Sequence, residues 1–397
     1  MDEPSAEPTP RRRRWPRRLL IGVLAFIAVF YVAGGWYFSN MILTRALSGE
    51  ERRASLEPNY NLVVRGIGDG FIVLEDPRNE EPSLRLQGVW GLRWEGGYGQ
   101  VGAVTEQSGG GRRVVRGFEV LSGDPPSVGQ AAELDERAFP DPETAGVYVR
   151  DVMVPGPLGE YPAWMTDGNR PLWVIVVHGN SMSRLDNLRL LPALQEAGYP
   201  TLTITYRNDE GAPEDPSGFL RYGLTEWKDL EAAVQMALDQ GAPGIALMGD
   251  SMGGGVIAAF LERSPLASQI RAVVLDAPML NFSQTVDDNA SRETLPVIGL
   301  TLPSSLTAVA KWIAGWRFGV AWDDLDYLAG ANGFDAPILV FHGTQDLTVP
   351  IGTSEDLARR RPDLVTLVRC PGADHIECWN VDHQAYEQRV VQFLEAA

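Results

Sequence analysis

The pentapeptide Gly249-Asp250-Ser251-Met252-Gly253 fits the pattern G-x-S-x-G, which presents a serine hydroxyl for attack on a carbonyl carbon. It follows the apolar run IALM, typical of a buried strand, and precedes GGVIAAFLER, typical of a helix. On such a tight strand-to-helix turn the hydroxyl is exposed, and the helix N-terminus stabilises the negative charge that develops during attack. Pattern and context together predict that Ser251 is a nucleophile.

Residues from about 146 to 397 resemble the α/β-hydrolase superfamily of serine esterases, lipases and peptidases, which orders its triad as nucleophile, acid, histidine. The segment ILVFHGTQDLTVP is similar to the family's acid loop, and VTLVRCPGADHIECW places a histidine after the next predicted strand. The resemblance therefore implies Asp346 as the acid and His375 as the base. His375 takes the hydroxyl proton of Ser251 in this scheme, while Asp346 fixes the imidazole tautomer and stabilises its cation.

Other titratable residues remain as alternatives. Asp276 ends the strand predicted before the acid loop, and some members of the family take their acid from that position. Asp374 adjoins His375, but on an extended turn its side chain is expected to point elsewhere. The remaining candidates are interpreted as structural or surface residues: Asp335, His178, His342 and His383.

An oxyanion hole needs two N–H donors near the attacked carbonyl oxygen. The resemblance assigns the first to the residue after the nucleophile, Met252. It assigns the second to the loop that follows WVIVVHG. This chain has HGNSM there rather than the HGGG of lipases, which leaves Asn180 and Ser181, and we favour Asn180.

The two cysteines, Cys370 and Cys378, lie five residues before and three residues after His375. If this part of the chain is extracytoplasmic, oxidation is permitted and a disulfide is predicted. The bond would close a small loop around the base. Two unrelated buried thiols are the alternative.

Residues 19–38 form a run of twenty residues without a charge, preceded by six arginines between positions 11 and 18. A helix of that length measures roughly 30 Å, the thickness of a bilayer core. No A-x-A-like cleavage site follows, so we predict an uncleaved signal-anchor rather than a cleavable signal peptide or a buried core helix. The positive-inside rule then keeps residues 1–18 cytoplasmic and the rest extracytoplasmic.

Charge and composition exclude several classes of protein. With 34 Lys+Arg against 52 Asp+Glu the net charge is −18, which argues against a nucleic-acid partner. Four histidines and two cysteines without a CxxC or HxxxH arrangement argue against a metal site. We therefore expect neither a metal nor a cofactor.

The chain divides into five predicted parts. They are a basic tail (1–18), the span (19–38), a polar juxtamembrane spacer (39–58), a β-rich accessory unit with its linker (59–145) and the α/β-hydrolase domain (146–397). Alternating strands and helices in the last part predict a mostly parallel sheet with helices on both faces. Short apolar runs split by glycines predict a small antiparallel unit before it, and residues 122–143 are interpreted as its linker. The unit is either a cap or spacer, or a module that binds a substrate or partner.

Residues 281–333 are longer than a simple connection needs, and the family often inserts a lid at this place. The segment carries four large aromatic residues, Trp312, Trp316, Phe318 and Trp322. Two interpretations stay open: core packing by an ordinary crossover helix, or an apolar lid that binds an acyl chain or faces a membrane.

The sequence thus predicts a membrane-anchored serine hydrolase that cleaves a small-molecule or lipid-like carboxylic ester through an acyl-enzyme. The resemblance also extends to peptidases of the prolyl-oligopeptidase type and to thioesterases. A non-catalytic binding protein on a hydrolase fold is a further alternative. The sequence carries no prediction of the oligomeric state.

Overall fold

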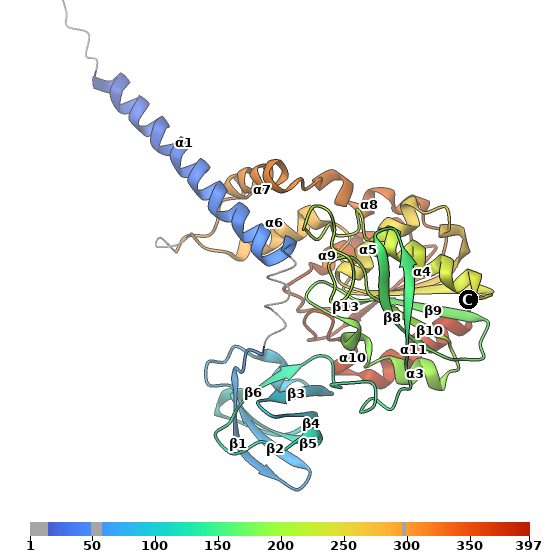
Figure 1. Ribbon diagram of the computed structural model, residues 1–397. Helices are drawn as coiled ribbons and strands as arrows, with labels where there is room; N and C mark the ends of the chain where they lie inside the picture. Colours follow the sequence, from blue (N-terminus) through green and yellow to red (C-terminus); the bar gives the residue numbers. More distant parts are fainter. Residues whose placement is uncertain (1–14, 49–57, 296–298) are drawn as a thin grey trace, which may run out of the picture.

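The computed structural model describes residues 15–48, 58–295 and 299–397. A long helix, α1 (Trp15–Ile42), continues as one π-helical turn, η1 (Leu43–Leu47). A window of this helix has a mean hydropathy of 2.3, so by length and composition it is able to cross a membrane. Figure 1 shows α1 projecting from a body made of two units. The predicted span lies within this helix, whereas residues 1–14 of the predicted basic tail lie outside the described residues.

The predicted spacer differs from the structure over residues 39–48. Instead of a polar linker, these residues complete the helix and pack on the body, with Ser39 and Leu47 buried. The prediction ended the helix at the polar pair Ser39-Asn40, but Met41, Ile42 and the turn after them supply a further apolar face. Residues 49–57 of that predicted spacer lie outside the described part of the chain.

The first unit of the body is a closed antiparallel barrel with the strand order β1-β2-β5-β4-β3-β6. The strands are β1 (Leu62–Gly68), β2 (Phe71–Glu75), β3 (Trp90–Trp94), β4 (Gly97–Ser108), β5 (Arg113–Gly123) and β6 (Ala131–Asp135), with short 3-10 turns η2 (Pro82–Arg85) and η3 (Gly109–Gly111). Apolar residues on alternate positions fill its interior, as period-two strands require. Strand β6 falls in the stretch interpreted as a linker. It pairs with both β1 and β3 and so closes the barrel.

The second unit is built on an eight-stranded mixed sheet with the order β14-β13-β12-β11-β9-β10-β8-β7. The strands are β7 (Arg150–Gly156), β8 (Gly159–Thr166), β9 (Leu172–Val177), β10 (Thr201–Ile204), β11 (Gly244–Asp250), β12 (Ile270–Asp276), β13 (Ile338–Gly343) and β14 (Val365–Cys370). Strands β14 to β10 are parallel, and the hairpin β7–β8 adds an antiparallel edge. The sheet is therefore mostly parallel, as predicted.

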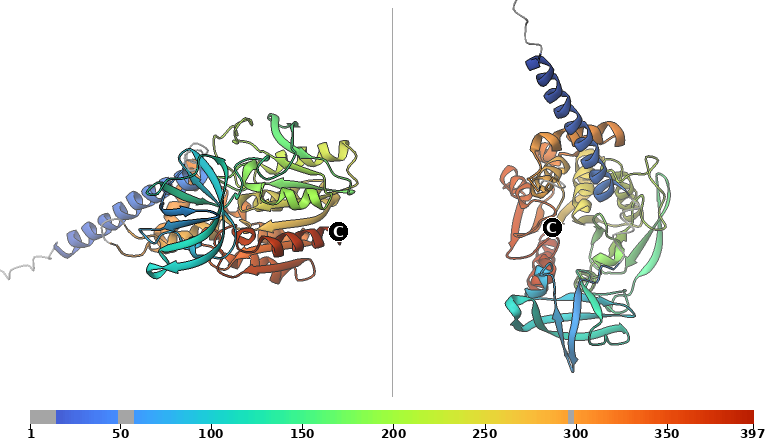
Figure 2. Two further views of the ribbon diagram at one scale, coloured as in Figure 1. Left: turned by 90° about the horizontal axis from the view of Figure 1, so that it is seen from below. Right: turned by 90° about the vertical axis from the view of Figure 1, so that its left-hand side faces the viewer.

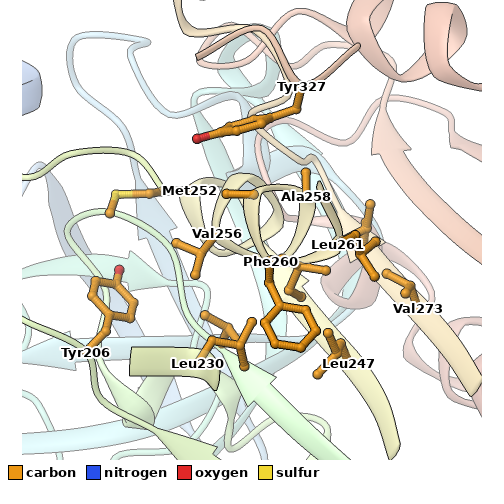
Figure 3. Packing of buried hydrophobic residues seen from close by; sticks show 14 of the residues in the cluster. Tyr206, Leu230, Leu247, Met252, Val256, Ala258, Phe260, Leu261, Val273 and Tyr327 are labelled. Carbon is orange, nitrogen blue, oxygen red and sulfur yellow. The ribbon is translucent and has the colours of Figure 1, made fainter. Parts of the chain in front are cut away.

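Helices follow the strands, and several of them cover the two faces of this sheet. They are α3 (Leu191–Glu196), α4 (Trp227–Asp239), α5 (Met252–Arg263), α6 (Phe282–Arg292), α7 (Ser304–Phe318), α8 (Tyr327–Gly330), α9 (Ile351–Arg360), α10 (Cys378–Val381) and α11 (His383–Glu395), with 3-10 turns η4 (Arg184–Asn187), η5 (Ala267–Gln269), η6 (Trp322–Leu325) and η7 (Ala331–Gly333). Ile175 and Val177 of β9 pack with α4 and α5, whereas Val174 and Val176 pack with α3 and α11 on the opposite face. Figure 3 shows the first of these cores around α5.

The long connection between β12 and β13 contains α6, α7, η6, α8 and η7, and residues 296–298 within it lie outside the description. Helix α7 lies beside α1 (Figures 1 and 2). The insertion therefore connects the apolar N-terminal helix with the unit that contains Ser251.

Candidate active site

Ser251 occupies the turn between β11 and α5 in a strained backbone conformation, with φ 52° and ψ −118°. Three main-chain hydrogen bonds hold it: its N–H donates to Asp276 O at 2.9 Å, and its carbonyl accepts from the N–H groups of Met279 and Gly254. At Gly253 a side chain is excluded, because a Cβ there would lie 2.2 Å from Val177 O. The sequence pattern thus corresponds to a sharp turn that presents the hydroxyl at the carboxyl edge of the sheet.

The structure brings together the three residues predicted to act on one another. His375 Nε2 lies 2.9 Å from Ser251 Oγ, and His375 Nδ1 lies 2.8 Å from Asp346 Oδ2. Ser251 follows β11, while Asp346 and His375 lie in the loops after β13 and β14. Because these strands are parallel, their carboxyl ends share one edge of the sheet, and residues far apart in sequence meet there.

The electrostatics around Ser251, His375 and Asp346 suit proton transfer. Burial alone would raise the pKa of Asp346, but the imidazole of His375 and hydrogen bonds from His342 and His375 hold it well below its usual range. Burial alone would lower the pKa of His375, but the Asp346 carboxylate outweighs this and raises it above its ordinary value. Asp346 therefore stays ionised and favours the tautomer that carries its proton on Nδ1, which leaves Nε2 free to accept the proton of Ser251.

The alternative acids occupy other positions. Asp276 is buried at the end of β12, and His375 Nδ1 is bonded to Asp346 instead. Burial, reinforced by the neighbouring Asp250, raises the pKa of Asp276 to about 7. Asp374 accepts the backbone N–H groups of both Leu347 and His375, so it connects the acid loop to the base loop. Asp335 is exposed.

The other histidines are packed into the framework. His178 Nε2 lies 2.8 Å from Asp209 Oδ2, and its ring stacks on Tyr206. His383 begins α11 with its ring 5.4 Å from that of Trp379.

His342 supports the acid from behind, a contact that sequence reasoning missed. Its Nδ1 lies 2.8 Å from Ser354 Oγ, and its Nε2 faces both Val349 O at 3.1 Å and Asp346 Oδ2 at 3.3 Å. The sequence signal that could have predicted this contact is a histidine four residues before the predicted acid.

The two residues predicted to form the oxyanion hole both lie close to Ser251. Met252 is the first residue of α5, so its N–H lies at the helix N-terminus, and Asn180 lines the same cavity as Ser251. Within the described residues, neither backbone N–H donates a hydrogen bond to the protein. The Asn180 side chain donates to Tyr222 Oη at 3.2 Å, which helps to position its loop.

A cavity of about 550 Å³ opens from Ser251 and His375 and is enclosed mainly by apolar side chains. One wall comes from the end of α1, and others come from α6 and the first half of α7. In the predicted lid, Phe318 is buried and Trp322 stacks on Phe282, whereas Trp312 and Trp316 are 72% and 73% exposed. The insertion thus contributes to the core, to the cavity and to an exposed aromatic surface.

A second cavity, of about 480 Å³, lies on the barrel side of His375 and is more polar. Charged side chains of the barrel unit, among them Glu81, Arg93 and Glu133, face Asp374 and Glu377 across it. The barrel is therefore adjacent to the loop that carries His375, rather than separate from it.

That loop is also braced by covalent and polar contacts. Cys370 and Cys378 form a disulfide with their Cα atoms 5.5 Å apart, and the bond encloses His375. From the barrel, the Trp90 indole donates to Glu377 Oε1 at 3.3 Å, and Asn380 Nδ2 donates to the carbonyl of Val89.

No group of three or more His, Cys, Asp or Glu side chains suited to a metal ion is found in the described ranges.

Comparison with known proteins adds a fold-level likeness. No family model matches the chain. The uncharacterized protein YfhR of Escherichia coli is 23% identical over 228 residues, which cover 56% of this chain and 70% of YfhR. The uncharacterized protein YqkD of Bacillus subtilis is 22% identical over 228 residues, 57% of this chain and 72% of YqkD. The crystal structure of the esterase Pf2001 of Pyrococcus furiosus matches at 20% identity and a TM-score of 0.51, over 64% of this chain and 95% of its own. At this identity the likeness shows a shared fold.

Proposed function

We propose, from the premise that the chain has the α/β-hydrolase fold, that it is a serine hydrolase that cleaves a carboxylic ester through an acyl-enzyme. The observation that carries the proposal is the hydrogen-bonded line from Ser251 through His375 to Asp346. A serine hydroxyl is a poor nucleophile until a base takes its proton, and this line supplies the base and its orienting carboxylate.

In the proposed reaction, Ser251 Oγ forms a bond to the ester carbonyl carbon while its proton passes to His375 Nε2. Asp346, held ionised by its low pKa, stabilises the imidazolium that results. Nε2 then gives the proton to the leaving alcohol oxygen as the ester C–O bond breaks, and the acyl group stays on Ser251. Water repeats the attack with His375 as base, which releases the carboxylic acid and restores the serine.

The negative charge on the carbonyl oxygen is stabilised by the N–H groups of Met252 and Asn180. Met252 lies at the start of α5, and Asn180 lies in a loop that is hydrogen-bonded to Tyr222. Loss of one such donor costs about 2.7–4 kcal/mol of transition-state stabilisation in hydrolases of this kind.

An ester is favoured as the substrate for two reasons. The cavity beside Ser251 has apolar walls that suit an acyl group. In addition, the protein of similar fold from Pyrococcus furiosus is an esterase.

The N-terminal helix is proposed to be an uncleaved membrane anchor, with the two units of the body on the extracytoplasmic side. Six arginines precede the apolar run and favour a cytoplasmic N-terminus. The disulfide between Cys370 and Cys378 suits an oxidising compartment. The end of the helix also forms part of the cavity wall, so its removal would open the site.

A fluorophosphonate probe, which reacts with activated serines, tests the proposal on the full chain in detergent. We expect labelling of the wild type and of Ser127→Ala, an exposed serine in the barrel unit, but not of Ser251→Ala. Ester hydrolysis should fall at least about 10³-fold in Ser251→Ala. An unlabelled, folded wild type would overturn the enzyme assignment, and labelling that survives in Ser251→Ala would overturn the site. Faster cleavage of matched thioesters or peptide amides would overturn the ester assignment.

A further inference from the structure

The second half of α1 does not stand free but packs along α7. Gly35 makes the close approach possible, because a Cβ there would lie 2.6 Å from Val309 Cγ1 and 2.9 Å from Ile313 Cδ1. One turn later, Phe38 is buried in a cluster with Leu306 and other residues of the insertion. The apolar helix thus has two parts: an exposed first half, and a second half that belongs to the body.

Polar contacts fix this second half in one position. Tyr31 Oη lies 2.7 Å from Ser305 Oγ. Arg317, in the last turn of α7, donates to Ser39 Oγ at 2.8 Å and to Asn40 Oδ1 at 2.7 Å. Its guanidinium also lies 3.7 Å from the ring centroid of Trp36. Such directional bonds specify a register that apolar packing alone would leave loose.

The turn after α1 is fastened to the hydrolase unit itself. The carbonyl of Leu47 accepts the N–H of Leu220, and Tyr222 Oη donates to the carbonyl of Ala46 at 3.0 Å. Tyr222 Oη in turn accepts from the Asn180 side chain, which belongs to the proposed oxyanion loop. The end of the N-terminal helix is therefore connected through one tyrosine to the reaction centre.

The same helix end forms a wall of the catalytic cavity. Phe38, Met41 and Ile42 line the space that opens from Ser251, together with Phe282 and Leu302 of the insertion. We propose that the residues of this helix end that line the cavity form the specificity-determining wall of an acyl pocket, and that the substrate is an ester of a long acyl chain drawn from the bilayer. These residues are Phe38, Met41, Ile42, Arg45 and Ala46. This inference rests on the proposed function, since it assigns the acyl side of that same site.

The elements around the cavity favour the membrane as the source of the substrate. The helix that lines it continues directly into the apolar stretch whose side chains are exposed from Leu19 to Val29. Helix α7, whose Ala310 lines the same cavity, exposes Trp312 and Trp316. Indole rings favour the interface between headgroups and acyl chains, so α7 is suited to lie there. A chain that enters beside these elements passes from lipid to Ser251 without crossing water.

A larger side chain in the proposed wall tests whether the wall determines specificity for the acyl chain. In Met41→Trp, the ratio of kcat/KM for a laurate ester to that for the matching acetate ester should fall at least tenfold, because the indole takes the space of the distal chain. Thr44→Trp is the matched control, since Thr44 is exposed on the same helix end and does not line the cavity. Its ratio should stay at the wild-type value. An unchanged ratio in Met41→Trp, or an equal fall in both variants, would overturn the proposal.

A binding measurement separates this inference from the proposed reaction. Ser251→Ala protein should bind cis-parinaric acid, a fluorescent fatty acid, and adding Met41→Trp should weaken that binding at least tenfold. Adding Met41→Ala should preserve it, which guards against a fold defect at this position. If wild-type protein is not labelled by the fluorophosphonate but this binding pattern is observed, the hydrolase is refuted and the acyl pocket is retained. Equal binding with and without Met41→Trp would refute the pocket even if the enzyme is active.

The lipid source is tested in vesicles of ether-linked phosphatidylcholine, which has no acyl ester to cleave. The protein is reconstituted with a long-chain diacylglycerol, and the matrix lipid is increased while the bulk amount of substrate is held constant. The rate should fall in proportion to the mole fraction of substrate in the bilayer. A rate that follows the bulk concentration would mean entry from water and would overturn the membrane route.

Discussion

At the scale of single residues, Asp346 is more firmly held than contact with one histidine requires. Its Oδ1 accepts the N–H groups of Thr348 and Val349, both at 2.8 Å, while Oδ2 faces His375 and His342. A carboxylate with this many donors keeps its charge and its orientation through the catalytic cycle. The orientation of the base is therefore set by the acid loop as a unit.

Asp346→Asn tests that role. The amide nitrogen would face Nδ1 and favour the wrong imidazole tautomer, so kcat for ester hydrolysis should fall by about 10³- to 10⁴-fold. Asp335→Asn, at an exposed carboxylate just before β13, is the control and should keep wild-type kcat. Steady-state kinetics with a chromogenic ester measure both. A loss below tenfold in Asp346→Asn would return Asp276 to consideration as the acid.

The raised pKa of His375 gives a pH dependence with a definite sign. The base must be neutral to accept a proton, so kcat/KM should rise with pH and level off above the pKa of the free enzyme. Because Asp346 raises that pKa, the midpoint should lie above about 6.5, the ordinary histidine value. Rates of fluorophosphonate labelling across pH give the same midpoint independently. A midpoint below the ordinary value would mean that burial outweighs the carboxylate.

Residue types alone identified the turn at Ser251, because strand, glycines and helix are contiguous in sequence. The supporting contacts of His342 and Asp374 were not predictable in the same way. The contact of Asp374 with Leu347 depends on β13 lying beside β14, so that two loops separated by a helix come within hydrogen-bond distance. The contact of His342 with Asp346 depends on how the loop after β13 turns back. The catalytic roles of Ser251, His375 and Asp346 stay predictions that the experiments above decide.

At the scale of elements, the loop that carries His375 is constrained at both ends. The disulfide between Cys370 and Cys378 joins the end of β14 to the start of α10. Between them, the backbone around His375 is also held by hydrogen bonds, among them Asp374 N to Glu377 Oε2 and Arg189 Nη1 to the carbonyl of Ile376. The crosslink thus limits the conformations of the loop in the unfolded chain more than in the folded one.

Replacing both cysteines by alanine should lower the free energy of unfolding by about 2–3 kcal/mol, the chain-entropy value for so short a loop. Thermal unfolding measures the change as a fall in Tm of several degrees. Wild-type protein in reductant is the matched comparison and should show the same fall. If the double variant loses stability but reductant leaves the wild type unchanged, side-chain packing rather than the crosslink carries the effect.

Elements with a regular apolar pattern were predictable from the sequence. The central strands of the sheet and the hairpin β7–β8 coincide with the apolar runs and with the turn between Gly156 and Gly159. The end of α1 and strand β6 were not, since both are short segments in which polar residues interrupt the apolar ones. Each is stabilised by a partner distant in sequence, α7 for the helix and the pair β1 and β3 for the strand.

At the scale of the whole molecule, the two units of the body meet at the base loop. Asn380 makes three buried contacts there: its Nδ2 donates to the carbonyls of Val89 and Glu136, and its Oδ1 accepts from Arg189. In Figure 1 the barrel lies against this side of the body, and the free half of α1 projects from another. The barrel unit thus packs against the loop that carries His375.

Asn380→Ala should therefore reduce stability and activity together. Each buried polar group left without a partner lowers the free energy of unfolding by about 1–3 kcal/mol. The loop with His375 also loses the hydrogen bonds of Asn380 to the barrel. Urea unfolding and kcat for ester hydrolysis report the two effects, with the exposed Asn332→Ala as control. Stability lost without any change in kcat would mean that the barrel does not influence the site.

The packing of α1 against the cavity also orders the assembly of the enzyme in time. About 330 residues separate Met41 from His375, so at 5–20 residues per second roughly 15 to 70 s pass between their synthesis. For most of that interval the apolar helix end is made but its partners α6 and α7 are not. If α1 enters the bilayer first, lipid shelters this surface until the body folds back onto it. In that case the cavity wall that is synthesised first lies in the membrane before His375 is made.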